Sequence, residues 1–132
     1  MINKIRFFLY SITAVLFIGC NMQKKDIIGK YSFHGANTID SLIFEKDIYT
    51  HKIYSKNLKL MYKSQDKWSF DKDRITLYGF YNNEDVLIEK YLSNKTAEKF
   101  LIIGSFPIYK ENKDLIVEVN SDEGIIYIKK NK

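Results

Sequence analysis

Cysteine, histidine and proline are scarce in this chain of 132 residues, which has one cysteine, two histidines and one proline. A single cysteine excludes an intramolecular disulfide framework and any cysteine-rich zinc or iron–sulfur site. The sequence also has no glycine-rich phosphate-binding loop and no recognisable nucleophile–histidine arrangement. We therefore expect a protein that is not an enzyme and that needs no cofactor.

An uncharged apolar run stands near the start of the chain. Lys4 and Arg6 precede it, and the run itself covers the 12 residues from Phe7 to Ile18. Twelve residues are too few for a helix that spans a membrane, which takes roughly 20. A basic start, a short apolar stretch and a small residue at its end are typical of an export signal.

The end of this run contains the only cysteine. Phe17-Ile18-Gly19-Cys20 resembles the lipobox of bacterial lipoproteins. That resemblance implies removal of residues 1–19 as a signal peptide, acylation of Cys20, a lipidated tether over 20–26 and a single domain over 27–132. Two or three acyl chains give stable membrane anchoring. Because residue 21 is Asn and not Asp, the resemblance further implies the outer membrane, with the periplasmic or surface face left open.

From Ile27 onward, short runs of β-branched and aromatic residues alternate with polar clusters every 8–12 residues, a spacing typical of antiparallel all-β domains. The turns between the runs are short and suit hairpins. The expected strands are Ile28–His34, Asp40–Phe44, Ile48–Tyr54, Lys59–Tyr62, Lys67–Phe70, Arg74–Tyr81, Val86–Leu92, Phe100–Tyr109, Leu115–Val119 and Ile125–Lys129.

About eight to ten such strands predict a small antiparallel meander barrel, because closure removes exposed strand edges. A two-sheet sandwich is the second choice. The segment 83–94 is ambiguous, since its apolar residues also fit one face of a short helix capped by Asn83. We favour the strand there because it continues the meander.

Three segments carry a second resemblance. They are Gly29-Lys30-Tyr31-Ser32-Phe33, the run from Leu42 to Tyr49, and Lys67-Trp68-Ser69-Phe70. Their arrangement is similar to that of small lipocalin-like domains in bacterial lipoproteins, with Gly29, Tyr31 and Trp68 at the pattern positions. The resemblance implies a calyx-like barrel, but it does not supply the ligand. A small hydrophobic ligand is one of the partners that we expect, beside an acidic protein or glycan. The alternative role for the two aromatic residues is core filling at a closed barrel end.

Basic residues are concentrated in one stretch. The predicted mature chain has 19 basic and 16 acidic side chains, and residues 52–74 alone have seven basic against three acidic. This stretch predicts a face for an acidic partner, which is an anionic glycan, a lipid headgroup or a protein, although lysines on the wet side of strands are the simpler interpretation. Nucleic acid is not an expected partner of an exported protein. The candidate partner-binding residues are Lys52, Lys56, Lys59, Lys63, Lys67, Tyr54 and Tyr62.

A metal site is not predicted. His34 and His51 with Asp40 or Asp47 have the ligand types for one, but nothing in the sequence fixes their spacing.

The first functional hypothesis is a lipid-anchored envelope barrel that binds a small ligand or partner. The alternative is a protein-interaction module, such as an immunity or envelope-assembly accessory, that acts through the basic 52–74 face.

Overall fold

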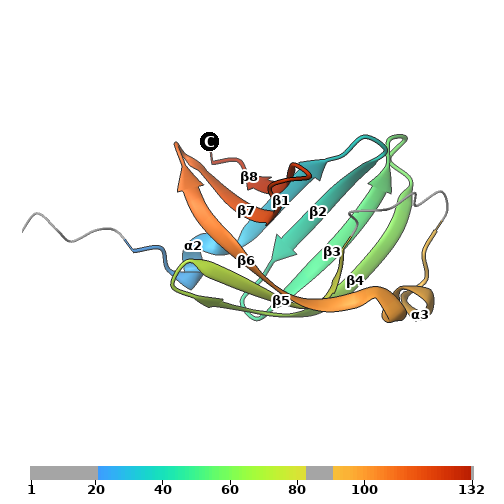
Figure 1. Cartoon of the computed structure of the whole chain (residues 1–132), viewed down its shortest axis with the longest axis horizontal. Coiled ribbons are helices and arrows are strands. Elements are labelled where there is room, and N and C mark those ends of the chain that lie inside the picture. Colours follow the sequence, from blue (N-terminus) through green and yellow to red (C-terminus); the bar gives the residue numbers. More distant parts are fainter. Residues whose placement is uncertain (1–20, 83–90, 132) are drawn as a thin grey trace, which may run out of the picture.

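The computed structural model describes residues 21–82 and 91–131, which form a closed barrel of eight antiparallel strands paired in chain order (Figure 1). The predicted all-β meander is confirmed. The strands are β1 (Gly29–His34), β2 (Thr38–Phe44), β3 (Ile48–Ser55), β4 (Leu60–Asp71), β5 (Arg74–Tyr81), β6 (Leu101–Glu111), β7 (Asp114–Asn120) and β8 (Ile125–Lys129).

Two of the predicted strands are one. The expected strands 59–62 and 67–70 are the two ends of β4, because the polar residues between them continue the ladder with β3 from Leu60 to Lys67. The expected strand Val86–Leu92 falls mostly on residues 83–90, which lie outside the described part of the chain, as does most of the alternative helix. Tyr91 and Leu92 are not in a strand. Helix α3 (Asn94–Ala97) follows them and is capped by the Ser93 hydroxyl, then continues as the 3-10 turn η1 (Glu98–Phe100).

A short helix occupies part of the predicted tether. Helix α2 (Lys24–Ile27) begins three residues after Asn21 and buries the Ile27 side chain completely. Met22 also packs against the core. Residues within and directly after the predicted tether 20–26 therefore pack on the barrel, because burial of apolar side chains is favourable. Figure 1 shows α2 at one end of the barrel and α3 at the opposite end.

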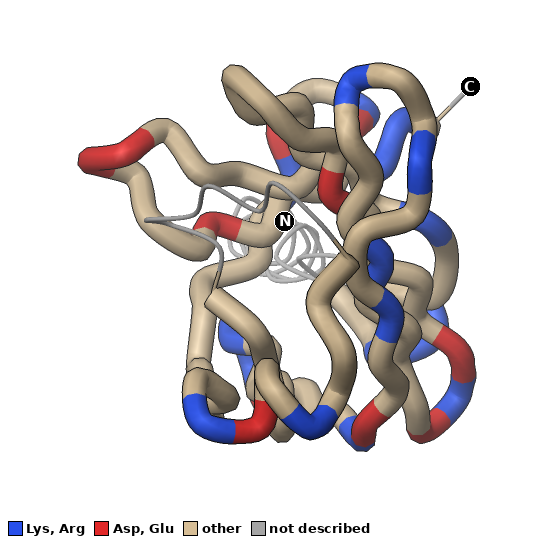
Figure 2. Tube along the Cα trace, turned by 90° about the vertical axis from the view of Figure 1, so that its right-hand side faces the viewer, with Lys and Arg blue, Asp and Glu red and all other residues tan. Residues whose placement is uncertain are grey.

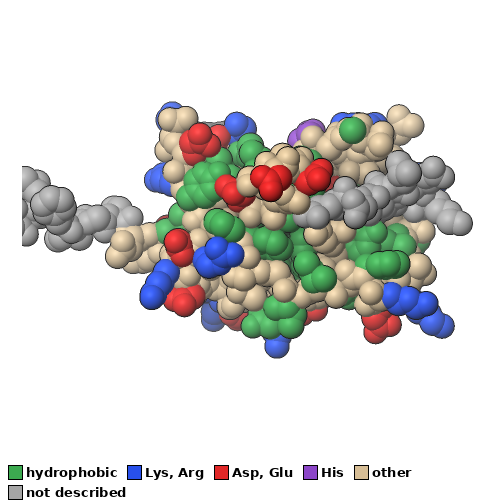
Figure 3. All heavy atoms as spheres, in the orientation of Figure 1, with side chains coloured by type: hydrophobic (Ala, Val, Ile, Leu, Met, Phe, Trp, Pro, Cys, Tyr) green, Lys and Arg blue, Asp and Glu red, His purple; other side chains and the backbone are tan. Residues whose placement is uncertain are grey.

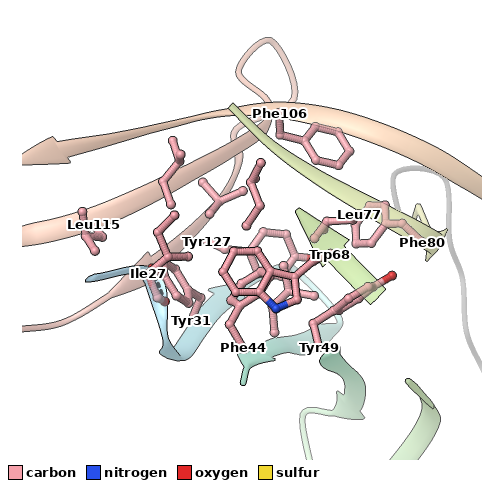
Figure 4. Close-up of a cluster of buried hydrophobic side chains, with 14 of the residues drawn as sticks. Ile27, Tyr31, Phe44, Tyr49, Trp68, Leu77, Phe80, Phe106, Leu115 and Tyr127 are labelled. Atoms are coloured by element: carbon pink, nitrogen blue, oxygen red, sulfur yellow. Dashed lines mark hydrogen bonds between the residues drawn. The ribbon is translucent and has the colours of Figure 1, made fainter. Parts of the chain in front are cut away.

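Inward-pointing side chains fill the middle of the barrel. Tyr31 and Trp68 both pack edge-on against Phe44, with ring centroids 5.2 Å and 5.1 Å away. Figure 4 shows these rings pointing toward one another beside Tyr49 and Tyr127. An eight-stranded barrel is just wide enough for side chains to fill. Here aromatic rings occupy the space that an open calyx would leave for a ligand.

In the described part of the chain, no helix has the length and apolar character needed to cross a membrane.

Candidate binding site at the barrel opening

Strands β4 and β5 separate over half of their length. They pair from Trp68–Leu77 to the turn at Asp71–Arg74. Beyond Leu77, β5 is bulged and then follows β6, with Phe80 opposite Ile102. In the described residues, the first half of β4 pairs in a ladder only with β3, apart from one bond in which the Leu92 amide donates to the Met61 carbonyl at 2.6 Å. In the part of the chain that the structure describes, the barrel wall is therefore open between β4 and β5.

A cavity of about 390 Å³ lies at this opening. Its wall combines an aromatic ring, an aliphatic side chain, a hydroxyl, amides and charged groups from five elements. The lining residues are Tyr62, Ser64, Gln65 and Asp66 of β4, Gly79 of β5, Asn94, Lys95 and Glu98 of α3 and η1, and Leu101 of β6. The volume lies in the range of roughly 300–1,000 Å³ that small-molecule sites have. The wall is mostly polar, whereas such sites are more often lined by apolar side chains.

Gly79 shapes the rim of the cavity. Its φ of +56° lies in the left-handed region, which side chains with a Cβ rarely adopt. A Cβ at this position would collide with the carboxylate of Asp66. Asp66 itself is held by the backbone amide of Lys67, which donates to Oδ1 at 2.7 Å. The glycine therefore leaves room for a carboxylate at the cavity wall.

A buried polar layer lies behind the cavity. His51 is 0% exposed and stands directly opposite Ser64, whose hydroxyl is buried at the cavity wall. The Asp40 carboxylate is 1% exposed, accepts a hydrogen bond from the Tyr127 hydroxyl at 3.1 Å, and lies 3.7 Å from His51 Nε2. Three strands thus supply one titratable group each to the barrel interior.

Aromatic rings enclose His51. Phe80 stacks on the imidazole at 5.2 Å between ring centroids, and Tyr62 meets it edge-on at 5.5 Å. Neither ring nitrogen has a hydrogen-bond partner among the described residues. A buried polar group without a partner is costly. Tyr62 contacts the imidazole and also lines the cavity. It therefore lies between His51 and the cavity.

Burial keeps the interior phenols neutral. Desolvation raises the pKa of Tyr31 and Tyr49. It also raises the pKa of Tyr127, where the neighbouring Asp40 carboxylate adds to the effect. These three hydroxyls therefore act as hydrogen-bond donors over the ordinary pH range. Tyr31 donates to the Ile27 carbonyl at 2.8 Å and Tyr49 to the Tyr78 carbonyl at 2.6 Å.

The predicted basic residues lie on the hairpin of β3 and β4. Lys52 stands directly opposite Lys63, and Lys56 and Lys59 are exposed in and beside the turn that joins the strands. Lys67 lies further along β4, where its ammonium sits 4.7 Å from the centre of the Tyr78 ring. In Figure 2, segments with Lys and Arg run along one side of the trace, and acidic segments stand at several turns.

Tyr54 and Tyr62, the two predicted aromatic partner-binding residues, do not lie on the same surface. Tyr54 is half-buried at the end of β3, close to the turn. Tyr62 is 1% exposed and points into the barrel, so it does not share the outer surface with the lysines. The strand alternation puts it on the same side as Ser64 and Trp68.

The residues that carry the second resemblance, Gly29, Tyr31 and Trp68, lie in or against the core of this barrel. Tyr31 is fully buried, and Trp68, 3% exposed, donates from Nε1 to the Glu45 carbonyl at 2.8 Å. Gly29 has a φ of +138°, and the side chain of Lys129 occupies the space that a Cβ at this position would need. These positions close the α2 end of the barrel, which is the core-filling role that the sequence left open. Cys20 lies outside the described residues.

Sequence reasoning missed the polar layer as a unit. From the sequence, His51 and Asp40 were candidates only as metal ligands together with His34. In the structure, His34 is exposed at the end of β1. One signal was available, because Asp40 alternates with the apolar Leu42 and Phe44 and so shares their inward face. Tyr127 is 87 residues from Asp40 in the sequence, and only closure of the barrel brings the two together.

The fold and the opening define a small closed antiparallel barrel of eight strands, consistent with a lipocalin-like fold, with a filled centre and a lateral cavity. The search for relatives found no match to a protein-family model, to a curated protein or to a solved structure.

Proposed function

We propose that this protein is a lipid-anchored, non-catalytic barrel of the cell envelope that binds a small polar ligand at the opening between β4 and β5. The observation that carries the proposal is the cavity of about 390 Å³ at a break in the strand ladder. The centre of the barrel is filled by rings, so the ligand site is at the side and not in the middle. Its wall favours a polar ligand over the hydrophobic one that a calyx would hold.

The cavity wall indicates which groups such a ligand carries. Asp66 and Glu98 accept hydrogen bonds, and the Tyr62 ring and the Leu101 side chain supply flat and aliphatic contact. A ligand with hydrogen-bond donors on a small ring or short chain satisfies this set.

A thermal-shift screen of small polar compounds tests the site. A ligand at 100 times its Kd raises the free energy of unfolding by about 2.7 kcal/mol. We expect Ser64→Leu to abolish the shift produced by a hit and Ser69→Leu to preserve it, because Ser69 is exposed on the other face of the same strand. A screen without hits, or hits that survive Ser64→Leu, would overturn the proposed site.

The anchor is supported by the sequence around Cys20 and by the position of the chain that follows it. Helix α2 begins at Lys24, so only Asn21–Gln23 separate the anchor from the folded barrel. Three residues span at most about 11 Å. Cys20→Ala should abolish labelling of the protein by palmitate. Continued labelling would show that the acylated residue is another one.

The alternative function is protein interaction through the β3–β4 hairpin, and one observation favours it. Lys52 and Lys63 are directly opposite each other, and like charges in this position destabilise a sheet. An acidic partner would relieve that repulsion. Reversal of Lys56, Lys59 and Lys63 to Glu should then remove partners from a pull-down, while the same reversal at the exposed residues Lys46, Lys99 and Lys113, outside the 52–74 stretch, should not. Identical partners from both variants would exclude this surface.

A further inference from the structure

A basic recess lies at the end of the barrel where the described chain begins. Its volume is about 500 Å³, and it is bounded by α2 and by residues of β6, β7 and β8. Lys25, Lys110 and Lys129 line it, against one acidic residue, Asp26. Figure 3 shows basic, acidic and apolar side chains together at this end of the molecule.

The positive charge of the recess is largely unneutralised. Among the described residues, Lys25 and Lys110 have no ion-pair partner, since the ion pairs involve other lysines. The Asp26 carboxylate accepts a hydrogen bond from the Gln23 amide at 2.8 Å and so serves the first turn of α2. The ammonium groups of Lys25 and Lys110 lie beside one carboxylate, Asp26, which already accepts a hydrogen bond. The recess therefore favours the binding of an anion.

Lys129 is fixed in place. Its Nζ donates to the carbonyl of Asp26 at 2.9 Å and to the carbonyl of Ile28 at 2.6 Å. An ammonium group has three donors, so one remains for a ligand. Because carbonyls at the end of α2 hold this charge, the recess has a positioned cation as well as two exposed ones.

The recess also has an apolar part. Leu115 is 4% exposed and Met22 is partly buried, and both line the recess beside the lysines. A free inorganic anion gains nothing from these side chains. An amphipathic anion, with a phosphate next to a glycerol and the first methylene groups of acyl chains, contacts both parts.

We propose that this recess binds the headgroup of an anionic phospholipid in the membrane that carries the protein. The inference rests on the anchor proposed above, because Asn21 lines the recess and is the residue after Cys20. Adjacent Cα atoms are about 3.8 Å apart. Acylation at Cys20 would therefore hold the recess at the membrane surface, where anionic lipid is concentrated and attracts basic groups.

Native mass spectrometry of the acylated full-length product in detergent micelles tests this, with phosphatidylglycerol and phosphatidylcholine added in equal amounts. We expect selective retention of phosphatidylglycerol. Lys25→Gln combined with Lys110→Gln should reduce that selectivity by about 25-fold, at roughly fivefold for each lysine near an anionic headgroup. Lys56→Gln with Lys59→Gln removes the same charge at the opposite end of the barrel and should leave the selectivity unchanged.

Lysine acetylation in nanodiscs gives a second readout within one molecule. Discs with phosphatidylglycerol should protect Lys25 and Lys110 relative to discs of phosphatidylcholine alone, with Lys56 and Lys59 unaffected. Equal protection in both discs, equal loss of selectivity in both double variants, or full protection by inorganic phosphate without anionic lipid would overturn the proposal. Failure of the anchor is distinguishable, because it shows as a missing acyl mass while lipid retention in micelles is still measured.

Discussion

Replacement of Gly79 by alanine tests the geometry of the cavity rim. At φ +56° an alanine has a conformational energy about 1–2 kcal/mol higher than in the right-handed region. Its Cβ would also collide with the Asp66 carboxylate, which must then rotate and lose its 2.7 Å hydrogen bond from the Lys67 amide. That loss adds about 1 kcal/mol. Gly79→Ala should therefore lower the free energy of unfolding by about 2–3 kcal/mol.

Gly124→Ala is the matched control. Gly124 has a φ of +69°, and no atom lies within 4 Å of the position that an alanine Cβ would take, so only the backbone cost applies. Urea unfolding followed by the fluorescence of the only tryptophan, Trp68, measures both variants. At roughly 4 °C per kcal/mol for a domain of this size, Gly79→Ala should lower Tm by about 10 °C.

A double variant isolates the contact between the two strands. Asp66→Ala in the Gly79→Ala background should recover the part of the loss that comes from the collision, about 1 kcal/mol as a coupling energy. If Gly79→Ala destabilises no more than Gly124→Ala, or if the coupling is zero, Asp66 does not occupy the space that Gly79 leaves and the described rim is incorrect.

Three further predictions concern the interior and the basic face. Tyr127→Phe should lower the free energy of unfolding by about 2 kcal/mol in urea titrations, because the buried Asp40 carboxylate loses a donor; an unchanged midpoint would contradict the buried layer. Burial raises the pKa of Tyr31, Tyr49 and Tyr127, so their stabilising effect is complete below pH 10 and decreases above it. The free energy of unfolding should then fall by about 4 kcal/mol per pH unit above 10, and absorbance at alkaline pH should show tyrosines that ionise only with unfolding. Lys63→Glu should stabilise the sheet by about 0.5 kcal/mol by turning its repulsion with Lys52 into attraction, whereas a destabilised variant in the same titration would contradict the register.

The strand pattern was readable in the sequence because burial of one face imposes a period of two. Arg74–Tyr81 and Ile125–Lys129 have the predicted bounds. The merging of two predicted strands into β4 was not readable, because the polar residues between them are kept in the ladder by β3 and not by their own preference. Likewise, the helix over residues 24–26 of the predicted tether was not readable, because it depends on the burial of Ile27, the first residue of the predicted domain.

The sequence by itself determined the fold class, the stretch in which the basic residues lie and the position of the lone cysteine, because each of these depends on local order or composition. Only the tertiary structure decided which polar groups meet. Barrel closure brings Tyr127 to Asp40, the bulge at Gly79 opens the wall beside Asp66, and α2 positions Lys129 beside Lys25 and Lys110. These contacts join residues far apart in the chain, so they depend on the register and twist of the strands, which residue preferences do not specify.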